Sequence, residues 1–171
     1  MKFVFGFIVG IVALCAAVYC YFAFGFAPVA TASGPMPMEV KLAHMALDAK
    51  ISRDAPKRTP FQANDADLQN AARLYRQHCA VCHGLPDGVK SATQKGMFPN
   101  PPLLLHGKGV TDDPAGETYW KVKNGIRLTG MPAYGGALSE KDLWSISELM
   151  AGADKLSADV VAILNQPMLG Q

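Results

Sequence analysis

The sequence carries almost no excess of charge of either sign, because 16 Lys and Arg residues are balanced by 14 Asp and Glu residues. A nucleic-acid-binding protein would show a strongly basic patch or stripe, so this balance argues against that class. The chain also lacks internal repeats and low-complexity tracts. Its 171 residues are enough for one small domain and a membrane anchor.

Cysteine is scarce, and two of the four residues, Cys15 and Cys20, lie within an uncharged apolar run. A structural zinc site needs a second pair of Cys or His ligands at metal-ligand spacing, and the chain offers none outside that run. A thioredoxin-like redox pair belongs to a strand-turn-helix context, but no alternation of apolar and polar residues precedes Cys79. These two interpretations of the remaining cysteines are therefore disfavoured.

Those cysteines belong to the stretch Cys79-Ala80-Val81-Cys82-His83. Two cysteines three positions apart, followed at once by histidine, form the attachment signature of c-type haem. The thiols add across the haem vinyl groups, and the imidazole reaches the iron as proximal ligand. The sequence thus predicts one covalent haem c, attached through Cys79 and Cys82, with His83 bound to the iron.

Residues 3–27 carry no charge and are dominated by Phe, Val, Ile, Ala and Gly. About 25 helical residues at about 1.5 Å each reach about 37 Å, which exceeds a bilayer core of about 30 Å. The alternative is a signal peptide cleaved after Ala30-Thr31-Ala32. Because the run is longer than a usual signal-peptide core and carries Tyr19 and Tyr21 as interfacial aromatics, we expect residues 1–27 to be a single transmembrane anchor.

The next stretch, residues 28–60, is expected to form a stalk. Three prolines before residue 38 mark stiff, non-helical chain. Apolar residues at roughly helical spacing over 38–54 predict a short amphipathic helix, which packs on the following domain or on a partner subunit. His44 within it is interpreted as an ordinary surface histidine. Prolines at 56 and 60 then place the domain boundary.

We expect residues 61–155 to form the main domain. Asn64 or Asp65 caps a helix that runs to about His78, and residues 84–109 show no sustained period, which predicts one long loop. A helix over 117–125 follows. Ser139 then opens a capping box with Asp142 for a helix with Leu143, Ile146 and Met150 on its apolar face. A last weak helix over 158–165 belongs to a tail, residues 156–171.

A thioether at the other axial position on the iron would close the haem to ligands. Met150 lies on a helical apolar face and Met168 in the tail, while Met97 stands in the long loop. Met131 stands in Gly130-Met131-Pro132, where the glycine allows close approach to the ring and the proline stiffens the loop. We therefore predict Met131 as the second ligand, with Met97 as the less favoured alternative.

Residues from about 63 to 151 resemble a class I cytochrome c domain. The resemblance rests on a helix that ends in Cys-x-x-Cys-His, a proline-leucine loop, a helix with a Tyr-Trp pair, and Gly-Met-Pro before a final helix. It covers about half of the chain and implies a mainly α fold of helices and loops wrapped around one haem. With the anchor added, the whole chain resembles membrane-anchored monohaem cytochromes c of bacteria.

In that family a proline carbonyl in the loop after the haem motif accepts a hydrogen bond from the ligand histidine. The matching place here is Pro101-Pro102, and the doubled proline leaves the register open by one residue. Arg127 is a candidate partner of a haem propionate or an ordinary solvated arginine. His78 and His106 are further candidate partners of the propionates, and Trp120 and Tyr134 are expected to pack against the haem. Five lysines are candidates for a ring that steers an acidic partner, or are ordinary solvated residues: Lys90, Lys95, Lys108, Lys121 and Lys123.

The resemblance implies a one-electron carrier, an electron-transfer protein rather than an enzyme by itself, because no substrate pocket, general base or nucleophile can be assigned. It also implies that the haem domain lies in the periplasm and the anchor in the cytoplasmic membrane, since bacteria attach haem c outside that membrane. The main alternative is a haem subunit of a larger membrane redox complex of the oxidase, nitric oxide reductase or dehydrogenase type. A haem sensor or peroxidase with a labile Met131 is a third interpretation. Redox partner proteins and the membrane are the expected partners, and nucleic acid is not.

Overall fold

The structure, a computed structural model, describes residues 2–107 and 111–167. Over these ranges the chain is helical and contains no strand, which confirms the predicted mainly α class. It divides into two compact units, residues 1–43 and residues 44–171, and each is described by itself. The domain limits expected from the sequence stay predictions.

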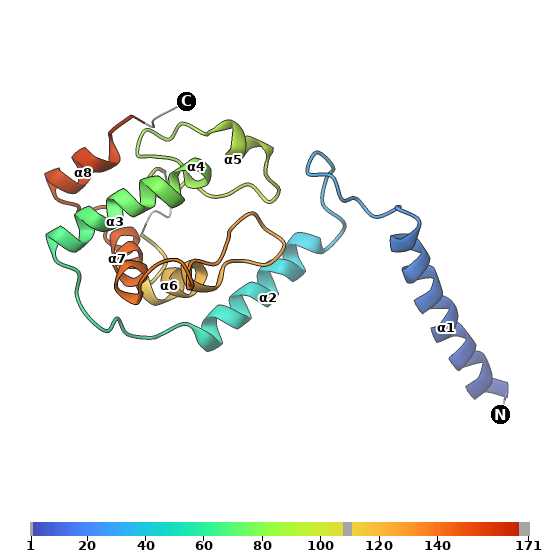
Figure 1. The fold of residues 1–171 in the computed structure, drawn as a ribbon. Coiled ribbons are helices and arrows are strands. Elements are labelled where there is room, and N and C mark those ends of the chain that lie inside the picture. The colour runs from blue at the N-terminus through green and yellow to red at the C-terminus, as the bar shows by residue number, and fades with distance from the viewer. Residues whose placement is uncertain (1, 108–110, 168–171) are drawn as a thin grey trace. The chain divides into compact units, whose positions relative to one another are not determined.

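The first unit contains α1, Lys2–Ala23 (Figure 1), a helix of 22 residues with no buried side chain. Helix α1 is long and apolar enough to cross a membrane. A signal sequence near the N-terminus can have the same length and composition. The helix ends before the apolar run does, because Gly25 adopts a left-handed conformation with φ 75°. The amide of Phe26 then donates to the Tyr21 carbonyl at 3.1 Å, the capping pattern that closes many helices.

Helix α2, Glu39–Asp54, corresponds to the helix predicted in the stalk. Its buried residue is Ile51, which is 3% exposed, and Ala55 just beyond the helix is buried as well. Leu42 and Met45 lie near its beginning and are half or more exposed. Most of the apolar surface of α2 is therefore open to solvent in this chain.

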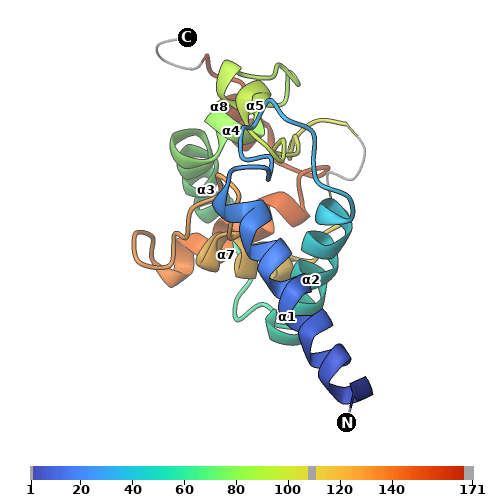
Figure 2. The ribbon, with the colours of Figure 1, turned by 90° about the vertical axis from the view of Figure 1, so that its right-hand side faces the viewer.

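The core of the second unit is formed by α3 (Asp65–His78), α6 (Ala115–Asn124), α7 (Glu140–Ala151) and α8 (Ala158–Leu164). Helix α7 packs against both α3 and α6, and α8 packs against α3 (Figures 1 and 2). Fully buried side chains join these helices: Ala71, Ala72, Tyr75, Leu143, Leu149, Val160 and Leu164. Helix α8, which the sequence predicts as a weak helix of the tail, thus contributes two residues to the core.

Two helix starts show how local sequence sets the fold. Asn64 caps α3 in a complete capping box with Asp67, so the predicted start is confirmed. At α7 the Ser139 hydroxyl accepts from the Asp142 amide at 3.1 Å, as predicted. The hydroxyl also donates to the Asp142 carboxylate at 2.6 Å. In a complete capping box this carboxylate would instead accept from the backbone amide of Ser139.

The prediction of one unbroken loop over residues 84–109 is wrong. A short helix, α5 (Ala92–Gly96), interrupts it, and Ser91 caps that helix by accepting from the Gln94 amide at 3.0 Å. A helix of five residues is too short to show an apolar period, so periodicity alone cannot reveal it. Helix α5 lies beside α4 (Ala80–His83), at the end of the unit where α3 terminates (Figures 1 and 2).

Candidate functional site

Helix α3 delivers the chain to the candidate site. Its inner face carries Ala71, Ala72 and Tyr75, all buried against the core, and these contacts fix the position of its last turn. Cys79 ends α3, where its amide donates to the Tyr75 carbonyl at 2.8 Å, and it also begins α4. The attachment motif therefore starts on a rigid element.

The motif itself forms one helical turn. The Cys79 carbonyl accepts from the amides of Cys82 and His83 at 3.1 and 2.8 Å. Residues three and four positions apart in a helix share a face, so two thiols and one imidazole are brought together on one side of α4. Both cysteines are free. Burial, and secondarily the charge of Cys82, raises the pKa of the Cys79 thiol to about 12.

His83 is oriented by a backbone carbonyl. Its Nδ1 lies 2.9 Å from the carbonyl oxygen of Pro102. Because a carbonyl only accepts, Nδ1 carries the proton and donates, which leaves Nε2 as the nitrogen with a free lone pair. Burial lowers the pKa of His83, and the hydrogen bond to Pro102 opposes that shift. The imidazole is thereby kept neutral and directed, as a metal ligand requires.

The two adjacent prolines have different partners. The Pro102 carbonyl serves His83, whereas the Pro101 carbonyl accepts from the Gln94 side-chain amide at 2.9 Å. The sequence left open which proline carbonyl accepts from His83, and in this structure it is that of Pro102. The carbonyl of Pro101 is oriented by α5 and has no direct contact with the imidazole nitrogen.

Met131 lies at the end of a tightly hydrogen-bonded loop and is half-buried against the core. The Met131 carbonyl accepts from the Ile126 amide at 3.2 Å, and its own amide donates to the Thr129 hydroxyl at 3.1 Å. A Cβ added to Gly130 would overlap the methyl group of Met97. Met97 therefore packs against the loop that carries Met131, and both thioethers lie in the same part of the unit.

Several other predicted contacts of the haem have defined surroundings. The Tyr134 hydroxyl donates to the His78 carbonyl at 2.9 Å, and the two rings meet edge to face. His106 Nδ1 lies 3.0 Å from the Pro86 carbonyl oxygen. Trp120 is half-buried, Arg127 and His44 are exposed, and Met150 is buried in the core.

The five lysines do not form a uniform group. Lys121 pairs with Asp113 and Lys123 pairs with Glu140, so the charges of these two are partly neutralised by neighbours. Lys90 and Lys95 are exposed. Lys108 lies outside the described residues, as does Met168.

Sequence reasoning missed three residues that bind the carbonyls around His83. The Tyr75 hydroxyl donates to Gly84 at 2.8 Å, Ser91 donates to Val81 at 2.6 Å, and Gln94 donates to Pro101. One signal was available, because Ser91-Ala92-Thr93-Gln94 follows the Ser-x-x-Gln pattern of a capping box.

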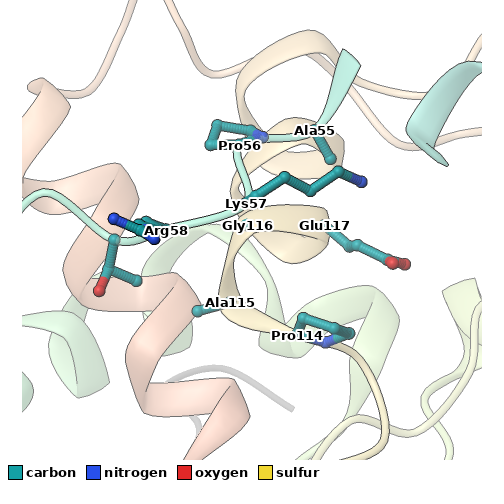
Figure 3. A pocket seen from close by; sticks show the side chains of 9 residues that line it. Ala55, Pro56, Lys57, Arg58, Pro114, Ala115, Gly116 and Glu117 are labelled. Carbon is teal, nitrogen blue, oxygen red and sulfur yellow. The ribbon is translucent and has the colours of Figure 1, made fainter. Parts of the chain in front are cut away.

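A cavity of about 500 Å³ lies elsewhere in this unit (Figure 3). It is lined by residues 55–59, after α2, and by residues 114–117 at the start of α6. None of the cysteine, histidine or methionine residues of the candidate site lines it. At its edge the chain passes close to Gly116, where a Cβ would overlap the Pro56 carbonyl oxygen.

The donor set of the site fits a c-type haem. Two free thiols and a neutral imidazole share one turn, and a half-buried thioether lies on a separate loop. Apolar side chains packed on the core accompany them, among them Leu85, Leu104 and Leu105. This combination of sulfur and nitrogen donors within an apolar shell is what an axially ligated haem needs.

An all-helical domain that carries this donor set is a cytochrome c domain. Residues 54–150, more than half of the chain, match the family described as cytochrome c oxidase, cbb3-type, subunit III, and the chain belongs to this family. It is also 32% identical over 96 residues to cytochrome c550 of Pseudomonas aeruginosa, a match that covers 53% of this chain and 59% of that protein.

These comparisons confirm the predicted resemblance to a monohaem c-type cytochrome. Residues 54–150 are therefore a haem c domain of the electron-transfer type. The match covers less than two thirds of the length of cytochrome c550.

Proposed function

We propose that the chain is a one-electron carrier tethered to the cytoplasmic membrane by α1, with its haem domain in the periplasm. Cys79 and Cys82 attach the haem, His83 and Met131 are the axial ligands, and Arg127 pairs with a propionate. The observation that carries the proposal is the shared turn of the two thiols and His83, whose Nδ1 is held by Pro102. The haem, when bound, supplies an iron that alternates between ferric and ferrous.

Hydrogen bonds within this chain hold both proposed axial ligands in place. The hydrogen bond to Pro102 keeps one tautomer of His83 and increases the basicity of Nε2. Hydrogen bonds within the loop from Ile126 to Met131 hold the thioether. A coordination sphere fixed on both sides changes little between oxidation states, which suits electron transfer better than ligand binding.

Attachment is tested by Cys79→Ala. We expect weaker covalent attachment, visible as altered haem staining and an altered pyridine haemochrome spectrum. Met131→Ala should leave the haem attached, open the distal side to carbon monoxide and lower the reduction potential, because a thioether favours ferrous iron. Double attachment in Cys79→Ala would contradict the motif, and an unchanged potential in Met131→Ala would contradict the ligand assignment.

A second candidate function is that of a haem subunit in a larger membrane redox complex. Two observations favour it: the family is named for an oxidase subunit, and α2 leaves Leu42 and Met45 exposed. Gentle detergent extraction followed by a native gel stained for haem distinguishes the two. A haem band near the monomer mass supports the tethered carrier, and a band at several times that mass with stoichiometric companions supports the complex.

The anchor is tested on the same extract. If α1 is retained, mass spectrometry of the mature protein finds residues 2–23, and the protein partitions with membranes after a salt wash. A mature chain that begins after Ala32 would instead identify a cleaved signal peptide.

A further inference from the structure

Helix α5 touches both chain segments that surround His83. Its N-cap, Ser91, accepts from the Gln94 amide at 3.0 Å and donates its hydroxyl to the Val81 carbonyl at 2.6 Å. Val81 stands between the two cysteines, in the last turn of α4, where helix carbonyls lack an intrahelical donor. One hydroxyl therefore caps the start of α5 and the end of the attachment turn.

Gln94 makes the matching connection to the proline loop. Its side-chain Nε2 donates to the Pro101 carbonyl at 2.9 Å, and its side chain is fully buried. The Pro101 carbonyl lies in the peptide plane that leads into Pro102, whose ring fixes its own φ near −65°. Once Gln94 holds that plane, only the ψ torsion of Pro102 remains to set the direction of the carbonyl that His83 uses.

Packing alone does not account for Gln94. Its Oε1 is buried and has no hydrogen-bond partner among the described residues. A buried polar atom without a partner destabilises the folded state, and a Met or Leu side chain of similar size would fill the same space without that cost. The amide donor is what Gln94 adds at this position, and its acceptor is the carbonyl next to the one that binds His83.

We propose that Ser91 and Gln94 are positioning residues for His83. Through their hydrogen bonds to the Val81 and Pro101 carbonyls they fix the attachment turn and the Pro102 carbonyl relative to each other. The inference rests on the proposed function of His83 as the proximal ligand. It assigns to α5 the control of imidazole basicity, and thus of the reduction potential, through carbonyls that neighbour the imidazole's own hydrogen bond.

The test compares Gln94→Met with Gln69→Met in full-length holoprotein. Gln69 supplies the matched control, because its Nε2 also donates to an oxygen, Asp65 Oδ2 at 2.8 Å, at the opposite end of α3 from the motif. In Gln94→Met the His83–Pro102 hydrogen bond weakens, the imidazole becomes a poorer electron donor, and the ferric state is stabilised less. We expect a more positive reduction potential in Gln94→Met and no shift in Gln69→Met.

A direct readout separates positioning from a change of polarity around the iron. In reduced protein with ¹⁵N-labelled histidine, NMR follows exchange of the His83 Nδ1 proton with solvent. Loss of the Gln94–Pro101 hydrogen bond should speed this exchange about fivefold, the factor that corresponds to one ordinary hydrogen bond. A shifted potential with unchanged exchange would overturn the proposal, and so would unchanged values of both.

Ser91→Ala keeps the proposal testable if Gln94→Met does not fold. Its control is Ser139→Ala, which removes the N-cap of α7 with no contact to the attachment turn. Both variants should lose similar stability, but only Ser91→Ala should speed Nδ1 exchange. Equal exchange in the two would refute the role of Ser91. If wild-type protein itself shows no imidazole bound to iron, the proposed function fails, which is a different outcome from a normal wild type with unresponsive variants.

Discussion

Removal of the Tyr75 hydroxyl tests how strongly burial fixes the backbone next to His83. Tyr75 is 0% exposed, and its hydroxyl donates to the carbonyl of Gly84, also buried, at 2.8 Å. In Tyr75→Phe this carbonyl loses its donor in a place where water does not replace it. The expected loss is about 1–3 kcal/mol of unfolding free energy, the usual cost of leaving a buried polar group unpaired.

Tyr134→Phe is the matched control. The Tyr134 hydroxyl also donates to a backbone carbonyl, that of His78, at 2.9 Å. The two bonds are therefore nearly equal in length, but Tyr134 is half-buried and His78 is exposed. Solvent can hydrate the His78 carbonyl after the substitution, so the expected loss stays below about 1 kcal/mol.

Urea unfolding of full-length holoprotein in mild detergent measures both values. With a slope of about 1–3 kcal/mol per molar urea, the midpoint of Tyr75→Phe should fall clearly below that of Tyr134→Phe at an unchanged slope. Equal midpoints, or a larger loss in Tyr134→Phe, would refute the argument that burial decides the cost. With His83 as the proposed axial ligand, haem absorbance during the urea titration of Tyr75→Phe should also report loss of that ligand at a lower urea concentration, since Gly84 follows His83.

Three further predictions concern other parts of the second unit. Gly116→Ala should lower the unfolding free energy by about 1–3 kcal/mol in urea titrations, because the new Cβ overlaps the Pro56 carbonyl oxygen; a variant as stable as wild type would contradict this packing. Leu128 has φ 62° and is 93% exposed. A β-branched residue tolerates this left-handed region least and glycine tolerates it best. Leu128→Val should therefore have a lower melting temperature than wild type, and Leu128→Gly should not. Hydrogen bonding to Lys123 lowers the pKa of Glu140, so this pair stabilises the fold above the ordinary glutamate pKa and the gain is lost as pH falls through the lowered value. Glu140→Gln should remove that part of the pH dependence of the urea midpoint, and an unchanged dependence would count against the pair.

The sequence predicts best the features whose causes are local. The start of α3 follows from Asn64 and Asp67, which lie three residues apart and bind each other's backbone. The turn at Cys79 follows from its position directly after an amphipathic helix. Helix α7 follows from Ser139 and an apolar stripe. In each case the residues that determine the structure lie within a few positions of one another.

Features that depend on distant residues were missed or left open. Nothing local distinguishes Pro101 from Pro102, because their carbonyls differ only in their distant partners, Gln94 for Pro101 and His83 for Pro102. Helix α8 looks weak in the sequence, since Val160 and Leu164 gain their importance only by packing on α3. The left-handed conformation of Leu128 has no sequence signal, because leucine seldom adopts it.

The backbone on the two sides of the candidate haem site is held in different ways. Carbonyls near His83 are bound by donors from distant parts of the chain: Tyr75 of α3, Ser91 and Gln94 of α5, and the Leu104 amide, which reaches the His83 carbonyl at 3.4 Å. The loop from Ile126 to Met131 is held largely by its own residues, together with bonds that join Tyr134 and Gly135 to the end of α6. Interactions drawn from several elements have to break together, whereas a self-bonded loop can open alone. The backbone on the Met131 side is therefore where this domain should open first, and the backbone on the His83 side should persist longer.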